Sequence, residues 1–443
     1  MTTVGDYPRT VEFIKTVWIS MSDGCRLAAS IWLPQDAESD PVPAIVEFIP
    51  YRRLDFTAVR DPCMHGYYAG HGYAGVRVDC RGTGDSEGIM EDEYLSQELQ
   101  DGVEIIAWLA SQPWCSGTVG MTGISWGGFN ALQVAALRPP ALKAIITACS
   151  TDDRYADDIH YMGGCLIKDN QMWASTMLGF NSRPPDPSVV GDRWRAMWME
   201  RLERQEPWLV RWLTHETRDE FWKHGSVCED SSAIEAAVYA VGGWADGYSN
   251  AIPRLLKGLR CPRKGLIGPW AHNWPFDGRP GPAIGFLQDA LRWWDYWLKG
   301  IDTGVMDEPM YRVWMQQSVP PASMYESRPG RWVAETSWPS PRIQDRSFHL
   351  SARGLIDTQA PGVTLTHQSP TTLGVDDGEW CPYGYEADLP LDQRGADGQS
   401  LSFDTDPLDE PVEILGAPAV ILDLTVDQPR AILAVRLNDV APA

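Results

Sequence analysis

The sequence GISWG at residues 123–127 places Ser125 between two glycines. An apolar run typical of a strand precedes this turn, and a run typical of a helix follows it. At a strand-to-helix turn, G-x-S-x-G holds the serine in a strained backbone conformation, and small neighbours let the two elements approach each other. The serine hydroxyl then lies beside the N–H groups at the start of the helix, which favour negative charge. These residue types suit nucleophilic attack by the serine on an acyl carbon.

A serine hydroxyl needs a base to take its proton, and His272 is the candidate among eight histidines. It follows the apolar run KGLIGPW, at the carboxyl end of an expected strand, where the active sites of open α/β sheets lie. His160, which follows an acidic stretch, is the main alternative. The imidazole needs a carboxylate to fix its tautomer, and Asp246 follows the strand expected at 236–243. The chain order Ser125, Asp246, His272 is that of α/β-hydrolases.

Strands and helices alternate on both sides of these residues, as is required to bring three distant side chains to one sheet edge. The runs VEFIKTVWIS and RLAASIWLP, separated by MSDG, are typical of a hairpin. Further strands are expected at 43–50, 73–80, 117–123, 142–150, 236–243 and 264–270, and helices at 94–113, 127–139, 250–259 and 285–300. Strands that alternate with helices indicate the α/β class, with a mostly parallel sheet covered on both faces.

Two segments interrupt this alternation. Residues 151–235 contain helix-forming residues with repeated tryptophan, and we interpret them as a helical cap inserted between two strands. From about residue 306, alternating apolar runs at 311–316, 347–352, 419–426 and 431–437 indicate an antiparallel β domain. We therefore expect a catalytic domain at 1–150 and 236–305, a cap at 151–235 and a C-terminal β domain at 306–443.

The composition is that of a soluble globular protein, with 44% apolar and 22% charged residues in a chain of 443. The net charge of −23 repels phosphate backbones and anionic lipids, so neither a nucleic acid nor a membrane is expected as a partner. Nine scattered cysteines without a C-x-x-C pair indicate neither a zinc ribbon nor a dithiol centre, and no metal is expected. No secretory signal pattern and no long apolar run occur, which favours a cytoplasmic location.

Five motifs occur in a fixed order along the chain: IPYRR, DCRGTGDSEG, GISWGG, GGWADGY and GPWAHN. In this combination they resemble the family of cocaine esterases and X-prolyl dipeptidyl-peptidases, the CocE/NonD hydrolases, from about residue 10 to the end of the chain. The resemblance implies an α/β-hydrolase fold with a helical cap and a C-terminal jelly-roll-like β domain. It also implies a serine hydrolase of ester or amide bonds that uses no cofactor.

The resemblance assigns roles to the residues at matching positions. It makes Ser125 the nucleophile, Asp246 the acid and His272 the base. Tyr51, in IPYRR, matches the family tyrosine whose hydroxyl joins the oxyanion hole, and the backbone N–H of Trp126 is the second donor. Such donors, aimed at developing negative charge, are a large part of catalysis in acyl transfer.

The sequence leaves the substrate open. Some tryptophans adjoin the expected triad or lie in the cap and could line an acyl pocket. The acidic run DDRYADD at 152–158 opens the cap and could grip a free amine, as acidic cap residues do in amino-ester and dipeptide-releasing relatives. An ester or amide hydrolase, an X-Pro dipeptidyl-peptidase or amino-acid ester hydrolase, and an inactive binding scaffold all stay open. The candidate pocket residues are Trp173, Trp244, Trp270, Asp152 and Asp153.

The end of the chain bears on the β domain. Family members usually continue with further strands, whereas this chain ends at Ala443, shortly after AILAVRLNDV. A sheet that stopped there would expose an unpaired edge. Three explanations stay open: a second chain or second copy completes an incomplete domain, the chain is truncated or cleaved, or the domain is smaller than usual.

Overall fold

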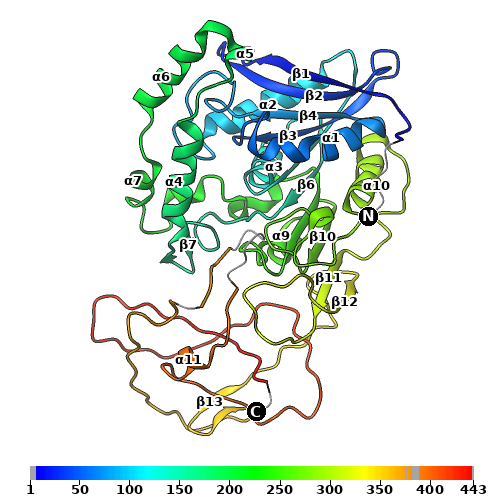
Figure 1. The fold of residues 1–443 in the computed structure, drawn as a ribbon. Helices are drawn as coiled ribbons and strands as arrows, with labels where there is room; N and C mark the ends of the chain where they lie inside the picture. The colour runs from blue at the N-terminus through cyan, green and yellow to red at the C-terminus, as the bar shows by residue number, and fades with distance from the viewer. Residues whose placement is uncertain (1–5, 376, 382–388, 442–443) are drawn as a thin grey trace.

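A ten-stranded mixed sheet forms the centre of the molecule (Figure 1). The computed structural model describes residues 6–375, 377–381 and 389–441. Neighbouring strands from β4 to β11 run parallel, while β1, β2 and β12 are antiparallel to their neighbours. The spatial order is β1 (Val11–Ser20), β2 (Arg26–Pro34), β4 (Ala74–Asp79), β3 (Val42–Ile49), β5 (Cys115–Ile124), β6 (Leu142–Ala148), β9 (Ala237–Gly243), β10 (Arg263–Gly268), β11 (Tyr311–Gln316) and β12 (Gly330–Glu335). The expected α/β class and N-terminal hairpin are confirmed.

Two hydrophobic clusters cover the two faces of the sheet, since strands in the middle of such a sheet are apolar on both sides. Successive residues of β3 enter different clusters: Ile45 packs in one and Val46 in the other. Helices α1 (Asp61–Gly70) and α10 (Phe286–Lys299) contribute to the cluster of Ile45. Helices α2 (Ser96–Ala110), α3 (Trp126–Ala136) and α9 (Ala251–Gly258) contribute to that of Val46. The four helices predicted around the motifs are therefore confirmed within a few residues of their expected ends.

Residues 151–235 lie between β6 and β9 and form the predicted helical insertion (Figure 1). Trp208, Trp212 and Trp222 are buried in the same cluster as α2 and α3, so apolar packing attaches this cap to the catalytic domain. None of the helices in the described ranges is both long and apolar enough to cross a membrane. The insertion contains β7 (Tyr161–Met162), β8 (Cys165–Leu166), α4 (Asp169–Asn181), α5 (Pro187–Val190), η2 (Gly191–Arg193), α6 (Trp194–Arg204), α7 (Trp208–Trp212), α8 (Glu220–Lys223) and η3 (Val227–Ala233); η1 (Phe56–Arg60) and η4 (Pro275–Asp277) lie outside it.

The strands of the C-terminal third are distributed differently from the prediction. The run at 311–316 forms β11, which pairs with β10 on one side and with β12 on the other, and so extends the central sheet. Beyond β12, a hairpin of β13 (His349–Ser351) and β14 (Gly354–Ile356) is followed by the one-turn helix α11 (Arg394–Asp397). Within the described residues, the runs at 419–426 and 431–437 form no strand, and apolar side chains such as Ile421 are exposed. These two runs, which the sequence predicts to be strands, therefore have no regular secondary structure.

Candidate active site

Ser125 lies at the sharp turn between β5 and α3, in the strained backbone conformation that the sequence predicts. Its φ angle is 57°, in the left-handed region that residues with a side chain rarely occupy. A Cβ on Gly123 would lie 2.4 Å from the Cα of Gly127, so only glycine allows the strand and the helix to approach this closely. The N–H of Ser125 donates to the carbonyl of Ala148 at 2.9 Å, which ties the turn to β6. The turn presents the Ser125 side chain at the carboxyl edge of the sheet.

Two hydrogen-bond donors lie beside Ser125. Tyr51 follows β3, the strand next to β5, and its buried hydroxyl interacts with the Ser125 side chain. Burial raises the pKa of Tyr51 above its ordinary value, so the hydroxyl keeps its proton and can donate. Trp126 begins α3, and the first N–H groups of a helix have no partner within the helix. Its buried indole donates to Oε1 of Glu98 at 2.6 Å, which fixes this first turn of the helix.

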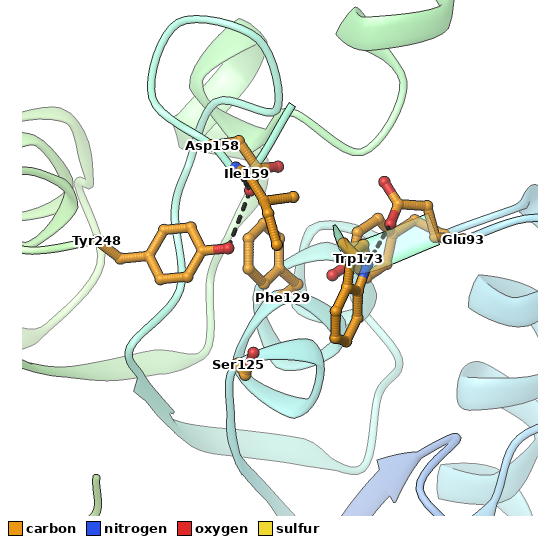
Figure 2. A pocket seen from close by; sticks show the side chains of 8 residues that line it. Glu93, Ser125, Phe129, Asp158, Ile159, Trp173 and Tyr248 are labelled. Atoms are coloured by element: carbon orange, nitrogen blue, oxygen red, sulfur yellow. Dashed lines mark hydrogen bonds between the residues drawn. The ribbon is translucent and has the colours of Figure 1, made fainter. Parts of the chain in front are cut away.

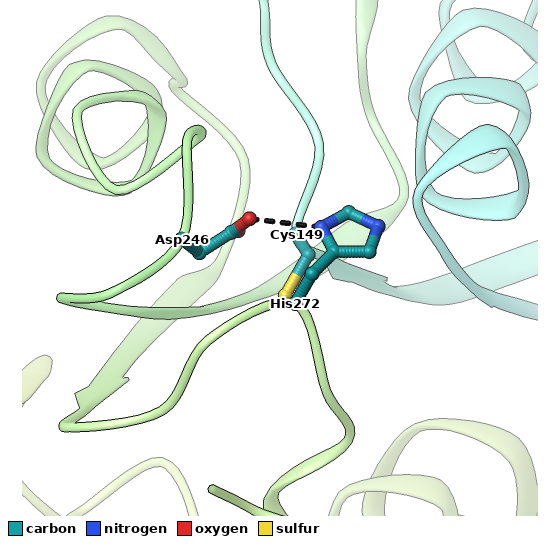
Figure 3. A group of neighbouring side chains, drawn as sticks. All are labelled: Cys149, Asp246 and His272. Carbon is teal, nitrogen blue, oxygen red and sulfur yellow. Dashed lines mark hydrogen bonds and ion pairs between the residues drawn. The ribbon is translucent and has the colours of Figure 1, made fainter. Parts of the chain in front are cut away.

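Asp246 and His272 face each other in loops that follow the adjacent strands β9 and β10 (Figure 3). Nδ1 of the imidazole lies 2.8 Å from Oδ1 of the carboxylate. Burial opposes a charge on the imidazole, but the attraction of the Asp246 carboxylate outweighs it and raises the pKa of His272. The structure therefore brings together the two side chains that the sequence places only at strand ends, and a carboxylate in this position can hold the imidazole in one tautomer.

The main chain sets the separation of these two loops. The N–H of Ala245, next to the candidate acid, donates to the carbonyl of Trp270 in the histidine loop at 3.0 Å. A Cβ on Gly243 would lie 1.9 Å from the same carbonyl oxygen, so glycine is required where the loops cross. The motif GGWADGY thus contributes a glycine for close approach as well as a carboxylate.

A small pocket opens on Ser125 (Figure 2). Trp173, on α4 of the cap and one of the candidate pocket residues, lines this pocket. Tyr248, two residues after Asp246, lines it from the other side, and the centroid of its ring lies 5.9 Å from that of His272. The histidine therefore lies next to the pocket that contains the serine. The lining residues are Glu93, Tyr94, Ser125, Phe129, Asp158, Ile159, Trp173 and Tyr248.

Trp244 and Trp270, also predicted to line the substrate pocket, are not among its lining residues. The indole of Trp244 donates to the carbonyl of Trp314 at 2.8 Å, and that of Trp270 donates to the carbonyl of Pro282 at 2.9 Å. Both rings hold loops and strands together. A position next to a catalytic motif does not decide the direction of a side chain, because successive residues of a loop point different ways.

Asp152 and Asp153, predicted to bind an amine, form ion pairs outside the pocket. Asp152 lies 2.6 Å from Arg254, and Asp153 lies 3.3 Å from Arg218. Another carboxylate of the same acidic run, Asp158, lines the pocket instead. The sequence indicates the acidic run but not which carboxylate faces inward, because the segment has no regular period.

Glu93 connects the pocket to a buried charged cluster, and no motif in the sequence signals it. Its Oε1 lies 2.7 Å from both Arg154 Nη2 and His160 Nε2. Burial opposes its charge, but His160 and Arg154 lower the pKa of Glu93 to about 2, so the carboxylate is ionised. Nδ1 of His160 lies 2.7 Å from Oδ1 of Asn170. Both ring nitrogens of His160 are thus engaged by Asn170 and Glu93, whereas His272 is the histidine that pairs with Asp246.

Two groups of side chains in the described ranges have the types and spacing of metal ligands. They are Cys149, Asp246 and His272 (Figure 3), and Glu47, Asp61 and His65. The first is the candidate acid–base pair with a thiol beside it. In the second, Arg77 lies 2.7 Å from Glu47 and 3.6 Å from Asp61, so a cation already balances these carboxylates. In both groups the side chains already interact with one another or with a cationic side chain, and their types do not favour a metal ion over these partners.

Replacing Tyr51 with phenylalanine tests the first oxyanion donor. Removal of one such donor typically lowers kcat by about 10²- to 10³-fold, and we expect a loss of this size on a chromogenic short-chain ester. Tyr67→Phe, in α1 on the other face of the sheet, is the matched control and should leave turnover unchanged. If Tyr51→Phe and the control turn over the ester equally fast, the Tyr51 hydroxyl is not an oxyanion donor.

Comparison with known proteins places the chain among hydrolases. Residues 23–274 match the X-Pro dipeptidyl-peptidase (S15) family, and residues 303–443 match the X-Pro dipeptidyl-peptidase C-terminal non-catalytic domain. The cocaine esterase of a Rhodococcus species is 26% identical over 473 residues, which cover 96% of this chain and 80% of the esterase.

Solved structures show the same fold. A CocE/NonD family hydrolase from Staphylococcus aureus has a TM-score of 0.63 and 18% identity, over 79% of this chain and 60% of that one. An α-amino acid ester hydrolase has a TM-score of 0.57 and 21% identity, over 81% of this chain and 64% of its own. The chain thus spans less than two thirds of the length of these two proteins.

The expected family is confirmed, because the S15 match covers more than half of the chain and includes the turn at Ser125 and the loops of Asp246 and His272. The second match confirms a C-terminal β domain of the kind found in this family. The chain therefore belongs to the X-Pro dipeptidyl-peptidase (S15) family, together with the CocE/NonD hydrolases, and is a serine hydrolase of the esterase and peptidase type.

Proposed function

We propose that this protein hydrolyses ester or amide bonds of small acyl substrates through an acyl-enzyme on Ser125. Three observations support the proposal: a strained serine that lines a pocket, a tyrosine hydroxyl beside that serine, and a buried Asp246–His272 pair. The imidazole of this pair contacts the ring of Tyr248, which lines the same pocket. A serine becomes a useful nucleophile only when a base can take its proton, and this pair is of the kind that does so.

The proposed cycle uses these side chains and water. His272 takes the proton of Ser125 as the serine oxygen attacks the acyl carbon. The negative charge that develops on the acyl oxygen is stabilised by the Tyr51 hydroxyl and the N–H of Trp126. His272 then gives the proton to the leaving alcohol or amine, and the bond to the leaving group breaks. Water, activated by the same imidazole, cleaves the acyl-enzyme and restores the serine.

A substrate panel distinguishes the alternatives that remain within the family. Similarity to a cocaine esterase favours an ester substrate. Membership of the X-Pro dipeptidyl-peptidase family favours instead a peptide that carries X-Pro. We expect aryl esters to be cleaved with the highest kcat/KM among aryl esters, amino-acid esters, β-lactam amides and X-Pro peptides. If X-Pro peptides are instead cleaved with the highest kcat/KM, the protein is a dipeptidyl-peptidase and not an esterase.

Asp158 supports a second candidate, a substrate with a free amine. It is buried in the pocket wall, and its Oδ1 accepts a hydrogen bond from the neutral hydroxyl of Tyr248 at 3.1 Å. Glu93 forms direct ion pairs with Arg154 and His160, whereas these two side chains act on Asp158 only through the attraction of their charges. Burial raises the pKa of Asp158 to about 7, so a substrate ammonium group would favour its ionised form.

Asp158→Asn tests amine recognition. If the carboxylate binds an ammonium group, the variant should lose roughly tenfold to a hundredfold in kcat/KM on an α-amino acid ester and little on the N-acetylated ester. Asp153→Asn, in the same acidic run but paired with Arg218 outside the pocket, is the control. Equal losses on both esters would rule out the amine and leave Asp158 a structural role.

A further inference from the structure

A short segment of the C-terminal region lies against the loop of the candidate acid. Cys381 is fully buried, and its Sγ lies 3.6 Å from Oδ1 of Asp246, 135 residues away in sequence. The same oxygen contacts Nδ1 of His272 at 2.8 Å. The thiol and the imidazole therefore share one carboxylate oxygen.

Trp380, the residue before this cysteine, packs against the two residues that follow Asp246 in its loop. A Cβ on Gly247 would lie 2.7 Å from the ring of Trp380, so the indole packs directly on the backbone there. The ring of Trp380 also meets that of Tyr248 edge-on, with centroids 5.3 Å apart. Trp380 thus contacts the two residues that link Asp246 to the pocket wall.

The thiol of Cys381 is placed as a hydrogen-bond donor to Asp246, and it also contacts His272. Burial raises the pKa of Cys381, whereas the hydrogen bond to His272 and the charge of its imidazole act in the opposite direction. A second thiol, Cys149, lies on the same pair, with its Sγ within 4.8 Å of the ligand atoms of Asp246 and His272 (Figure 3). Oδ2 of Asp246 is buried without a hydrogen-bond partner among the described residues, so the donors that face Oδ1 matter for the orientation of this carboxylate.

We propose that Trp380 and Cys381 are positioning residues for Asp246, and that the C-terminal region is in this way a working part of the active site. The proposal rests on the proposed function of the Ser125 site. Cys381 orients the carboxylate through its S–H, and Trp380 holds the backbone of the loop. Because Cys381 does not line the pocket, its loss affects the proton transfer and not the binding of the acyl group.

Variants of Cys381 test this role through separate kcat and KM values on a chromogenic ester. We expect Cys381→Ala to lower kcat about tenfold with KM nearly unchanged, since one hydrogen bond to a charged group is lost. Cys381→Ser keeps a donor at this position and should recover most of the loss. Cys63→Ala and Cys63→Ser, at an exposed thiol in α1, are the matched controls and should behave as the wild type.

The outcomes separate this proposal from that of the active site. If a fluorophosphonate labels Ser125 in the wild type and labels Cys381→Ala equally fast, the positioning role is wrong while the active site stands. Failure to label the wild type overturns the active site itself. If Cys381→Ala does not fold, Trp380→Phe and Trp380→Ala replace it: a fall in kcat that grows from Phe to Ala supports the role, and unchanged kcat in both rejects it.

Discussion

Replacing Ser125 with alanine should abolish ester turnover, with a fall in kcat on the order of 10⁶-fold. The loss is this large because no other group can form the acyl-enzyme once the hydroxyl is removed, and the oxyanion donors alone supply only residual catalysis. The fold should survive, since alanine retains the Cβ of serine and the turn is held by backbone contacts such as that between Ser125 N–H and the Ala148 carbonyl.

Two measurements make this test decisive. A fluorophosphonate should add one label to the wild type, located at Ser125 by peptide mass spectrometry, and none to Ser125→Ala. Ser116→Ala, at an exposed serine of the same strand, should be labelled and active like the wild type. Undiminished turnover in Ser125→Ala would reject the nucleophile, and an unlabelled, inactive wild type would instead favour a binding scaffold.

The central sheet could be predicted because its signals are local. The run that forms β5 and the run that forms α3 differ in period and are separated by the glycine-rich turn at Ser125. The direction of each strand then places the ends of β9 and β10 at the same edge, which is why Asp246 and His272 could be chosen. Geometry of this kind follows from chain order and requires no knowledge of side-chain contacts.

Strand pairing in the last third could not be predicted from the same signals. The run at 311–316 alternates in the same manner as those at 419–426 and 431–437, yet it alone joins the central sheet as β11. Pairing depends on partners distant in sequence, so an alternating run indicates a half-buried strand but not the sheet that it joins. It stays a prediction that a second chain or a second copy of this chain completes the domain at the exposed runs. Measurement of the molecular mass in solution tests it.

The pocket shows the same limit at the level of single residues. Trp173 could be chosen from the sequence because the cap is expected to lie over the serine. Glu93 belongs to no motif, and only the structure shows that it lines the pocket and binds Arg154 and His160. Tyr248 belongs to the motif GGWADGY, and its position two residues after Asp246 could have indicated a side chain on the same side of the loop.

Asp246→Asn should lower kcat on the order of 10⁴-fold while the protein stays folded. An amide can accept from or donate to Nδ1, so it does not select the tautomer in which Nε2 is free to take a proton from Ser125. It also has no charge with which to stabilise the imidazolium. Asp289→Asn is the matched control, because Asp289 is a carboxylate that binds Arg312 and Tyr239 at a distance from the pocket. A loss in the control as large as that in Asp246→Asn would mean that structure and not chemistry is affected.

The pH dependence of the same variant gives an independent test. In the wild type, the Asp246 carboxylate outweighs burial and raises the pKa of His272, so the imidazolium persists above the ordinary value of about 6.5. Only the neutral imidazole acts as a base, and kcat/KM of the wild type should therefore rise with pH above that value. A raised folded pKa also means that protonation stabilises the fold, fully below about pH 6.5 and progressively less as the pH rises through the folded value. In Asp246→Asn the rise of kcat/KM with pH should occur at lower pH than in the wild type. The decrease in folding stability with rising pH should also disappear in this variant. If both pH dependences are the same as in the wild type, the acid of the triad is another residue.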